Sequence, residues 1–139
     1  MANSRLVLRY IGHAVRPASL PFVPPEREDM ENLPPGREFE IPPGGIVLGR
    51  YKSADVHVYS AYVKGMHVRL WPVEDGIAAE DLASTNGTAV NGAVFSGQPE
   101  RRQVVLRVGD RLTLASTHDF EIVERAGRPD GANVPLVLP

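Results

Sequence analysis

The sequence has 139 residues, of which 42% are hydrophobic and 23% charged, and this is typical of one soluble globular domain. It contains no cysteine, which excludes disulfides, thiol catalysis and thiolate metal sites. The net charge is −2, so no overall positive charge drives binding to nucleic acid, and we expect none as a partner. The N-terminal apolar run is too short for a signal peptide or membrane span, so we expect a cytoplasmic protein that does not engage membranes.

Short apolar runs separated by Gly, Pro, Asn and Asp fill most of the chain, a pattern typical of strands joined by turns. The first predicted strand spans residues 6–11. The others are predicted at 38–41, 46–49, 56–58, 67–72, 77–81, 88–90, 93–95, 104–107, 111–115 and 120–125. Asn91-Gly92 supplies the positive φ angles of a type I′ hairpin turn. No stretch keeps a helical apolar period, so we predict an all-β sandwich of ten to eleven strands.

A long Pro-rich acidic loop is predicted after the first strand, at residues 14–36. Eight of the thirteen prolines lie between positions 17 and 43, and residues 24–40 carry six acidic and two basic side chains. Proline and like charge both favour an extended, solvated chain. Residues 126–139, rich in Gly and Pro, are predicted to form a loose C-terminal tail with a possible edge contact from its apolar residues.

Three segments stand out from the rest of the sequence. They are Gly49-Arg50, then Val63-Lys64-Gly65-Met66-His67, then the segment from Asp81 to Gly92. Together they resemble the forkhead-associated (FHA) domain family. The family pattern of Gly-Arg, Asp-Ile/Val, Val-Ser-x-x-His, Asp-x-x-Ser-x-Asn-Gly-Thr-x-Val-Asn-Gly and Gly-Asp runs in this order, through Asp55-Val56, to Gly109-Asp110. The resemblance covers residues 4–125 and implies an FHA-type β-sandwich that binds phosphothreonine peptides and is not an enzyme.

The resemblance also implies which residues form the site. Those expected to bind the phosphopeptide are Arg50, Lys64, Gly65, Thr85 and Asn86. Those expected to shape turns and brace loops are Gly49, His67, Ser84, Gly87, Asn91, Gly92, Gly109 and Asp110. The chemistry agrees with the first set, because phosphothreonine carries almost two negative charges and needs cationic, hydroxyl and amide donors. His67 resembles the family's buried histidine, which braces the loops.

One departure from the family pattern bears on phosphate binding. Lys64 stands where the family has a serine that donates to the phosphate, and Gly65 follows where a polar or basic residue is usual. Lys64 either contacts the phosphate as a flexible point charge or intrudes where a short side chain is needed. The second alternative implies a degenerate FHA scaffold that binds a protein independently of phosphorylation. An uncompensated loss of such a hydrogen bond, worth about 1.5–3 kcal/mol, would weaken binding about tenfold or more.

Other features leave alternatives open. Tyr59 and Tyr62 either form a platform that selects residues after the phosphothreonine or pack on the sandwich end. The acidic loop either is solvated or folds over the basic face as a phosphate mimic. A hydrolytic set of Ser84, His67 and Asp81 has only residue identity in its favour.

We expect no cofactor and no metal, because the four histidines lack ligand spacing. Trp71 is predicted to lie in the core. The expected partner is a phosphothreonine protein, either a Ser/Thr kinase or its substrate, and a monomer is the default state.

Overall fold

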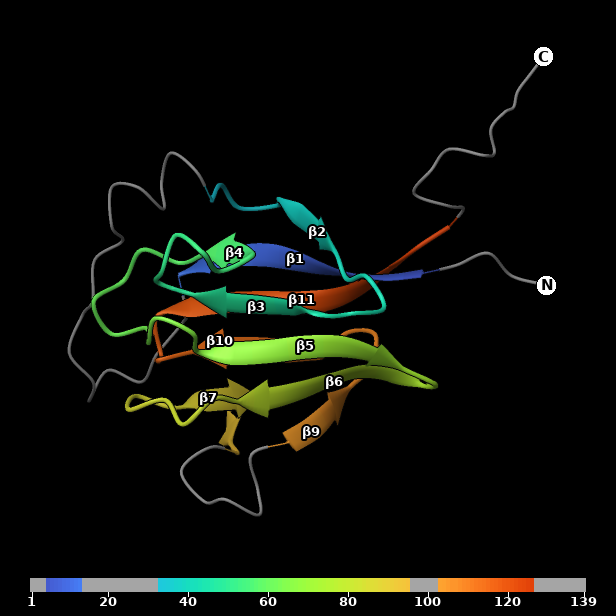
Figure 1. The fold of residues 1–139 in the computed structure, drawn as a ribbon. Helices are drawn as coiled ribbons and strands as arrows, with labels where there is room; N and C mark the ends of the chain where they lie inside the picture. Colours follow the sequence, from blue (N-terminus) through green and yellow to red (C-terminus); the bar gives the residue numbers. More distant parts are fainter. Residues whose placement is uncertain (1–4, 14–32, 96–102, 127–139) are drawn as a thin grey trace.

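Eleven strands form two sheets that pack face to face in the computed structural model, which describes residues 5–13, 33–95 and 103–126 (Figure 1). One sheet has six strands in the order β2-β1-β11-β10-β7-β8, and the other has five in the order β4-β3-β5-β6-β9. The strands are β1 (Arg5–His13), β2 (Glu38–Glu40), β3 (Ile46–Gly49), β4 (Val56–His57), β5 (Val68–Val73), β6 (Gly76–Asp81), β7 (Thr88–Val90), β8 (Ala93–Val94), β9 (Gln103–Leu106), β10 (Arg111–Leu114) and β11 (His118–Arg125).

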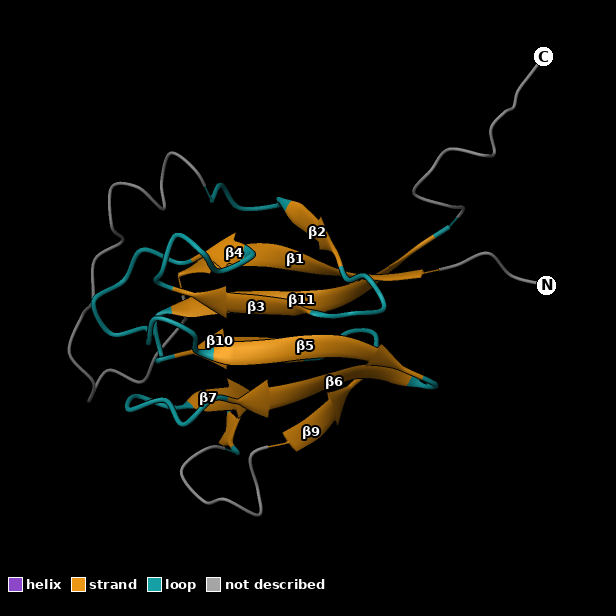
Figure 2. Cartoon of the chain, viewed as in Figure 1, coloured by secondary structure: helices purple, strands orange, loops and turns teal. Residues whose placement is uncertain are grey.

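The all-β prediction is confirmed, and Figure 2 shows only strands and loops in the described residues. Each predicted strand has a counterpart whose ends agree within two residues. The predicted hairpin also forms, because β7 and β8 pair antiparallel across Asn91 and Gly92, whose φ angles are 51° and 86°. In the described ranges no helix is long and apolar enough to cross a membrane.

The core lies between the two sheets and is built by alternation along each strand. In β5, Val68 and Leu70 are fully buried while Arg69 and Trp71 point to the outer face. The prediction that Trp71 is a core residue is therefore wrong. The ring lies on the outside of the sheet, where the Arg69 guanidinium carbon stacks 4.5 Å from its centroid. Alternation dictates this, because Leu70 already occupies the inward position.

Strand pairing brings three connections to one end of the sandwich, on the left in Figure 1. Val68 at the start of β5 pairs with Asp81 at the end of β6, and Leu48 near the end of β3 pairs with Val68. The β3–β4 loop (residues 50–55), the β4–β5 loop (58–67) and the β6–β7 loop (82–87) therefore emerge side by side. The tight turn between β5 and β6 lies at the opposite end.

The predicted loop at residues 14–36 stays a prediction, because residues 14–32 lie outside the described residues. At its end, residues 34–36 are exposed, but Leu33 is buried. Leu33 is 2% exposed and belongs to the core, and the Gly36 amide donates to the Tyr10 carbonyl at 2.7 Å. An apolar side chain between polar neighbours gains more from burial than from solvation, so the chain closes here. The predicted tail lies outside the described range from residue 127 onward.

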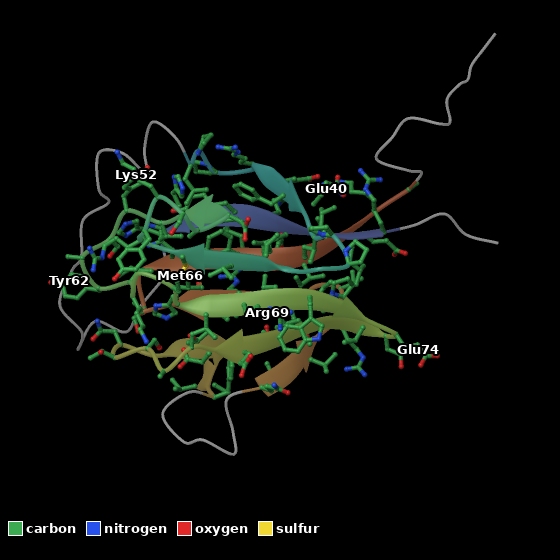
Figure 3. All side chains as sticks on the ribbon, in the orientation of Figure 1. Glu40, Lys52, Tyr62, Met66, Arg69 and Glu74 are labelled. Carbon is green, nitrogen blue, oxygen red and sulfur yellow. The ribbon has the colours of Figure 1, made fainter. Side chains whose placement is uncertain are left out.

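Two of the acidic residues counted with that loop belong instead to an edge strand. Glu38 and Glu40 lie in β2 and form ion pairs with Arg125 of β11 and Arg5 of β1. The hydrogen bond from Arg125 lowers the pKa of Glu38. These two charges are neutralised on the outer face of the six-stranded sheet, away from the loop-bearing end (Figure 3, Glu40).

Candidate functional site

The β3–β4 and β4–β5 loops run together as a short backbone ladder. The Arg50 amide donates to the Lys64 carbonyl at 3.0 Å, and the Tyr51 amide donates to the Gly65 carbonyl at 3.1 Å. The Arg50 side chain is exposed, and its Nε donates to the Val63 carbonyl at 3.1 Å. Its terminal nitrogens make no hydrogen bond to any described residue, so the outer edge of the guanidinium is available to an anion.

Gly49 is needed for this close approach. A Cβ built at Gly49 would lie 2.0 Å from the carbonyl oxygen of Gly65, so any side chain there would force the two backbones apart. The predicted architectural role of Gly49 therefore corresponds to a specific contact. It sets the separation between the loop that carries Arg50 and the loop that carries Lys64.

His67 is fully buried and connects two loops through both ring nitrogens. The Lys64 amide donates to Nδ1 at 3.0 Å, and Nε2 lies 2.9 Å from the carbonyl oxygen of Gly87. An amide can only donate, so Nδ1 accepts and the proton of the neutral ring sits on Nε2. Burial is the main cause that lowers the pKa of His67 and keeps the ring neutral, while the carbonyl of Gly87 opposes this shift.

Asp81 braces the β6–β7 loop from beneath. Its buried carboxylate accepts from the Ser84 amide at 2.9 Å, from the Ser84 hydroxyl at 2.6 Å and from the Thr88 hydroxyl at 2.5 Å. The Gly87 amide in turn donates to the Ser84 hydroxyl at 3.2 Å. Ser84 thus donates to Asp81, while His67 bonds to the Gly87 carbonyl, so these groups are not linked as a nucleophile and its base.

Two side chains link the β4–β5 loop and the β6–β7 loop, one from each loop. Lys64 Nζ donates to the Leu82 carbonyl at 2.7 Å, and Asn86 Nδ2 donates to the Tyr62 carbonyl at 2.8 Å. One of the two N–H donors of the Asn86 amide is therefore used by the β4–β5 loop. Its Oδ1 accepts no hydrogen bond from the described residues. Both side chains are exposed, so the tethers lie at the surface of the site.

Thr85 stands at the tip of the β6–β7 loop between the braced residues. It is exposed, and its hydroxyl makes no hydrogen bond within the described part of the chain. The predicted binding residues thus lie on three loops that are joined by direct hydrogen bonds. The local charge is positive, because Arg50, Lys52 and Lys64 are exposed.

Acidic residues offset only part of that charge, because Asp55 is the one acid on these three loops against three exposed cations. Asp55, in the β3–β4 loop, is exposed but holds the Val47 amide through Oδ2 at 2.8 Å. Asp81 is only 1% exposed and is occupied by the hydroxyls beneath the β6–β7 loop. The end of the sandwich therefore presents cations, hydroxyl and amide groups, which suit a phosphate bearing close to two negative charges.

Four of the predicted structural residues lie elsewhere. Asn91 Nδ2 donates to Asp110 Oδ1 at 3.1 Å, and the Arg111 amide donates to Asn91 Oδ1 at 2.9 Å. They brace a corner at the Arg111 end of β10, with Gly92 and Gly109 in the adjoining turns at positive φ. The β6–β7 loop meets β10 at its other end, where the Ala115 amide donates to the Gly87 carbonyl.

Sequence reasoning missed Tyr51 and Lys52. Tyr51 is 55% exposed, and its ring lies on Gly65, where a built Cβ would meet three ring carbons at 2.4 to 2.6 Å. The only signal was position, since both residues follow the Gly-Arg pair directly. The two tyrosines that were singled out behave differently from each other. Tyr62 is 51% exposed at the loop-bearing end (Figure 3), whereas Tyr59 packs edge-on against His57 with centroids 5.7 Å apart.

Within the described ranges no three His, Asp or Glu side chains gather as a possible metal site. The FHA domain family model matches residues 46–115. The chain is 38% identical over 88 residues to the ABC transporter ATP-binding/permease protein Rv1747 of Mycobacterium tuberculosis, which covers 63% of this chain but only 10% of that relative.

Solved structures share the same architecture. The FHA domain of the CT664 protein from Chlamydia trachomatis superposes with a TM-score of 0.63 at 20% identity, covering 88% of this chain and 99% of that one. The MEK1 FHA domain in complex with the HOP1 phosphothreonine peptide superposes with a TM-score of 0.54 at 17% identity, covering 63% of this chain and 87% of that one. With the family model matching half of the sequence across β3 to β10, the chain belongs to the FHA domain family.

Proposed function

We propose that this chain is a non-catalytic module that binds a phosphothreonine segment of a partner protein. The observation that carries the proposal is the convergence of Arg50 and Lys64 on adjoining loops, with their backbones 3.0 Å apart and their cationic groups exposed. The likeness to a domain that binds a phosphothreonine peptide supports the choice of ligand. A phosphate held by two cations and a hydroxyl gains charge-assisted hydrogen bonds that an unmodified threonine cannot make.

Lys64 fits this role despite replacing the family's serine. An ammonium has three N–H donors, and the Leu82 carbonyl uses one of them at 2.7 Å. Two donors remain for phosphate oxygens while the tether stays in place. The tether also keeps the long side chain directed toward the β6–β7 loop, which is why we favour phosphate binding over a degenerate scaffold.

Thr85 and Asn86 would hold the peptide around the phosphate. The Thr85 hydroxyl is exposed and can donate to a phosphate oxygen, and Asn86 Oδ1 can accept from a peptide amide while Nδ2 stays on Tyr62. Gly65 has no side chain, so it can contribute only backbone, and the Tyr51 ring covers it. The partner is a protein phosphorylated by a Ser/Thr kinase, or such a kinase itself, in the cytoplasm.

The test is a titration of the full chain with a library of phosphothreonine peptides and their unphosphorylated counterparts. We expect phosphorylation-dependent binders, and Arg50→Ala should weaken them about tenfold to a hundredfold. Arg107→Ala is the matched control, because Arg107 is exposed beyond β9 at the far end, and it should leave affinity unchanged. Absence of any phosphorylation-dependent binder, or full affinity in Arg50→Ala, overturns the proposal in favour of a phosphate-independent scaffold.

A further inference from the structure

Tyr51 occupies the space that a side chain at position 65 would fill. The Tyr51 amide donates to the Gly65 carbonyl at 3.1 Å, and the far end of its ring lies within 2.4 to 2.6 Å of a Cβ built on Gly65. Gly65 is buried, while Tyr51 as a residue is 55% exposed. The space beside Gly65 is therefore filled by an aromatic ring from the neighbouring loop.

An exposed tyrosine ring beside a cationic cluster has a definite preference for what it contacts. Its face can bury an aliphatic or aromatic side chain or stack under a cation. Here Arg50, Lys52 and Lys64 are exposed on the same two loops, and they repel a basic peptide side chain. The ring face is electron-rich and does not attract an acidic side chain, which would pair with these cations instead of covering the ring. An apolar side chain is the class that the ring favours.

We propose that Tyr51 is a specificity-determining residue that selects peptides with an apolar side chain beside the phosphothreonine. This inference rests on the proposed function, since the phosphate must first place the peptide at Arg50 and Lys64. Selectivity arises because an apolar neighbour that covers the ring removes apolar surface of both groups from water without desolvating a polar group. Gly65 supports this arrangement because it has no side chain and so leaves room for the ring.

The experiment scans each position flanking the phosphothreonine, comparing Gly, Leu, Lys and Glu. At one position Leu should bind about five- to tenfold more tightly than Gly in the native chain. Tyr51→Ala should remove that gain while the Gly-flanked phosphopeptide keeps its affinity, and Tyr51→Phe should keep the gain because the ring remains. If Leu gives no gain at any position, or the gain survives in Tyr51→Ala, the inference is overturned although phosphorylation-dependent binding stands.

Two further variants test whether the gain from Leu depends on the position of the Tyr51 ring on Gly65 or on any exposed ring at this end of the sandwich. Gly65→Ala should abolish the Leu gain, since its Cβ displaces the flexible ring, and the double variant with Tyr51→Ala should lose no more than either single one. Tyr62→Ala removes an equally exposed ring that does not lie on Gly65, and it should keep the gain. Loss of the gain in Tyr62→Ala alone would assign the preference to Tyr62 and overturn the role of Tyr51.

Discussion

Lys64 Nζ donates to the Leu82 carbonyl across 2.7 Å, so a side chain of the β4–β5 loop is fixed to the backbone of the β6–β7 loop. Asn86 Nδ2 links the same two loops in the other direction by donating to the Tyr62 carbonyl. His67 adds a third connection below them, between the Lys64 amide and the Gly87 carbonyl. Three cross-links of this kind hold the loops in place without a ligand, which reduces the ordering entropy that binding would otherwise cost.

Replacing Lys64 with methionine tests the contribution of its charge. Lys64→Met keeps the length of the side chain but removes the ammonium, so we expect phosphopeptide affinity to fall about tenfold. The dependence of affinity on salt concentration should also become shallower, because one cation no longer contacts the phosphate. Calorimetric titration at two ionic strengths measures both effects. Unchanged affinity and salt dependence would mean that the ammonium serves only as the loop tether.

Removing the Asp81 carboxylate should destabilise the fold. Asp81→Ala leaves two hydroxyls and an amide beneath the β6–β7 loop without their acceptor, and hydrogen bonds to charged groups contribute about 1.5–3 kcal/mol each. We expect the free energy of unfolding in urea to fall by about 3 kcal/mol. Glu74→Ala, an exposed acid after β5, should change it by less than about 0.5 kcal/mol. Equal effects of the two substitutions would contradict the bracing role.

Alternation and turn residues made the fold predictable from sequence. The runs at 46–49 and 88–90 coincide with β3 and β7, because each is a short run bounded by Gly or Asn-Gly turn residues. The family's motif, with its fixed intervals, also predicted His67, Ser84 and Gly49 as bracing residues, and each makes a close contact in or between the loops. Both kinds of signal lie within short stretches of the chain, so they can be read from the sequence without knowledge of the tertiary structure.

The errors arose where burial depends on residues distant in sequence. Trp71 is a large apolar residue, and only strand pairing reveals that it faces outward under Arg69. Leu33 lies among prolines and acids, and its burial requires the β1 strand beside it. Tyr51 gained its place from the absence of a side chain on Gly65, fourteen positions later. No local pattern in the sequence contains these contacts.

Gly49 should be the least replaceable glycine of the site. In Gly49→Ala the new Cβ meets the Gly65 carbonyl at 2.0 Å, and backbone cannot swing aside as a side chain can. We expect the free energy of unfolding to fall by about 3 kcal/mol or more. Gly44→Ala is the control, because a Cβ there has nothing within 4 Å. Urea unfolding of both variants measures the difference, and similar values for the two would show that the ladder between the loops can spread without cost.

Protonation of His67 should weaken the fold as the pH falls. Burial lowers its pKa below the ordinary 6.5, so between 6.5 and the lowered value the unfolded chain takes up a proton that the folded chain does not. Stability is therefore complete above about pH 6.5 and declines below it, by at most about 1.4 kcal/mol per pH unit from this group. A protonated ring would also point an Nδ1 proton at the Lys64 amide, breaking the link between the loops.

The groups around His67 determine the direction of its pKa shift. The Gly87 carbonyl and the Asp81 carboxylate favour the charged ring, whereas Lys64 and burial disfavour it, and burial dominates. Urea unfolding from pH 7.5 to 5 should show the decline, and His67→Gln should flatten it even if the variant is less stable overall. An NMR titration of the His67 ring should give a midpoint below 6.5. A midpoint above that value would reverse the sign and mean that the Gly87 carbonyl and Asp81 together outweigh burial at this position.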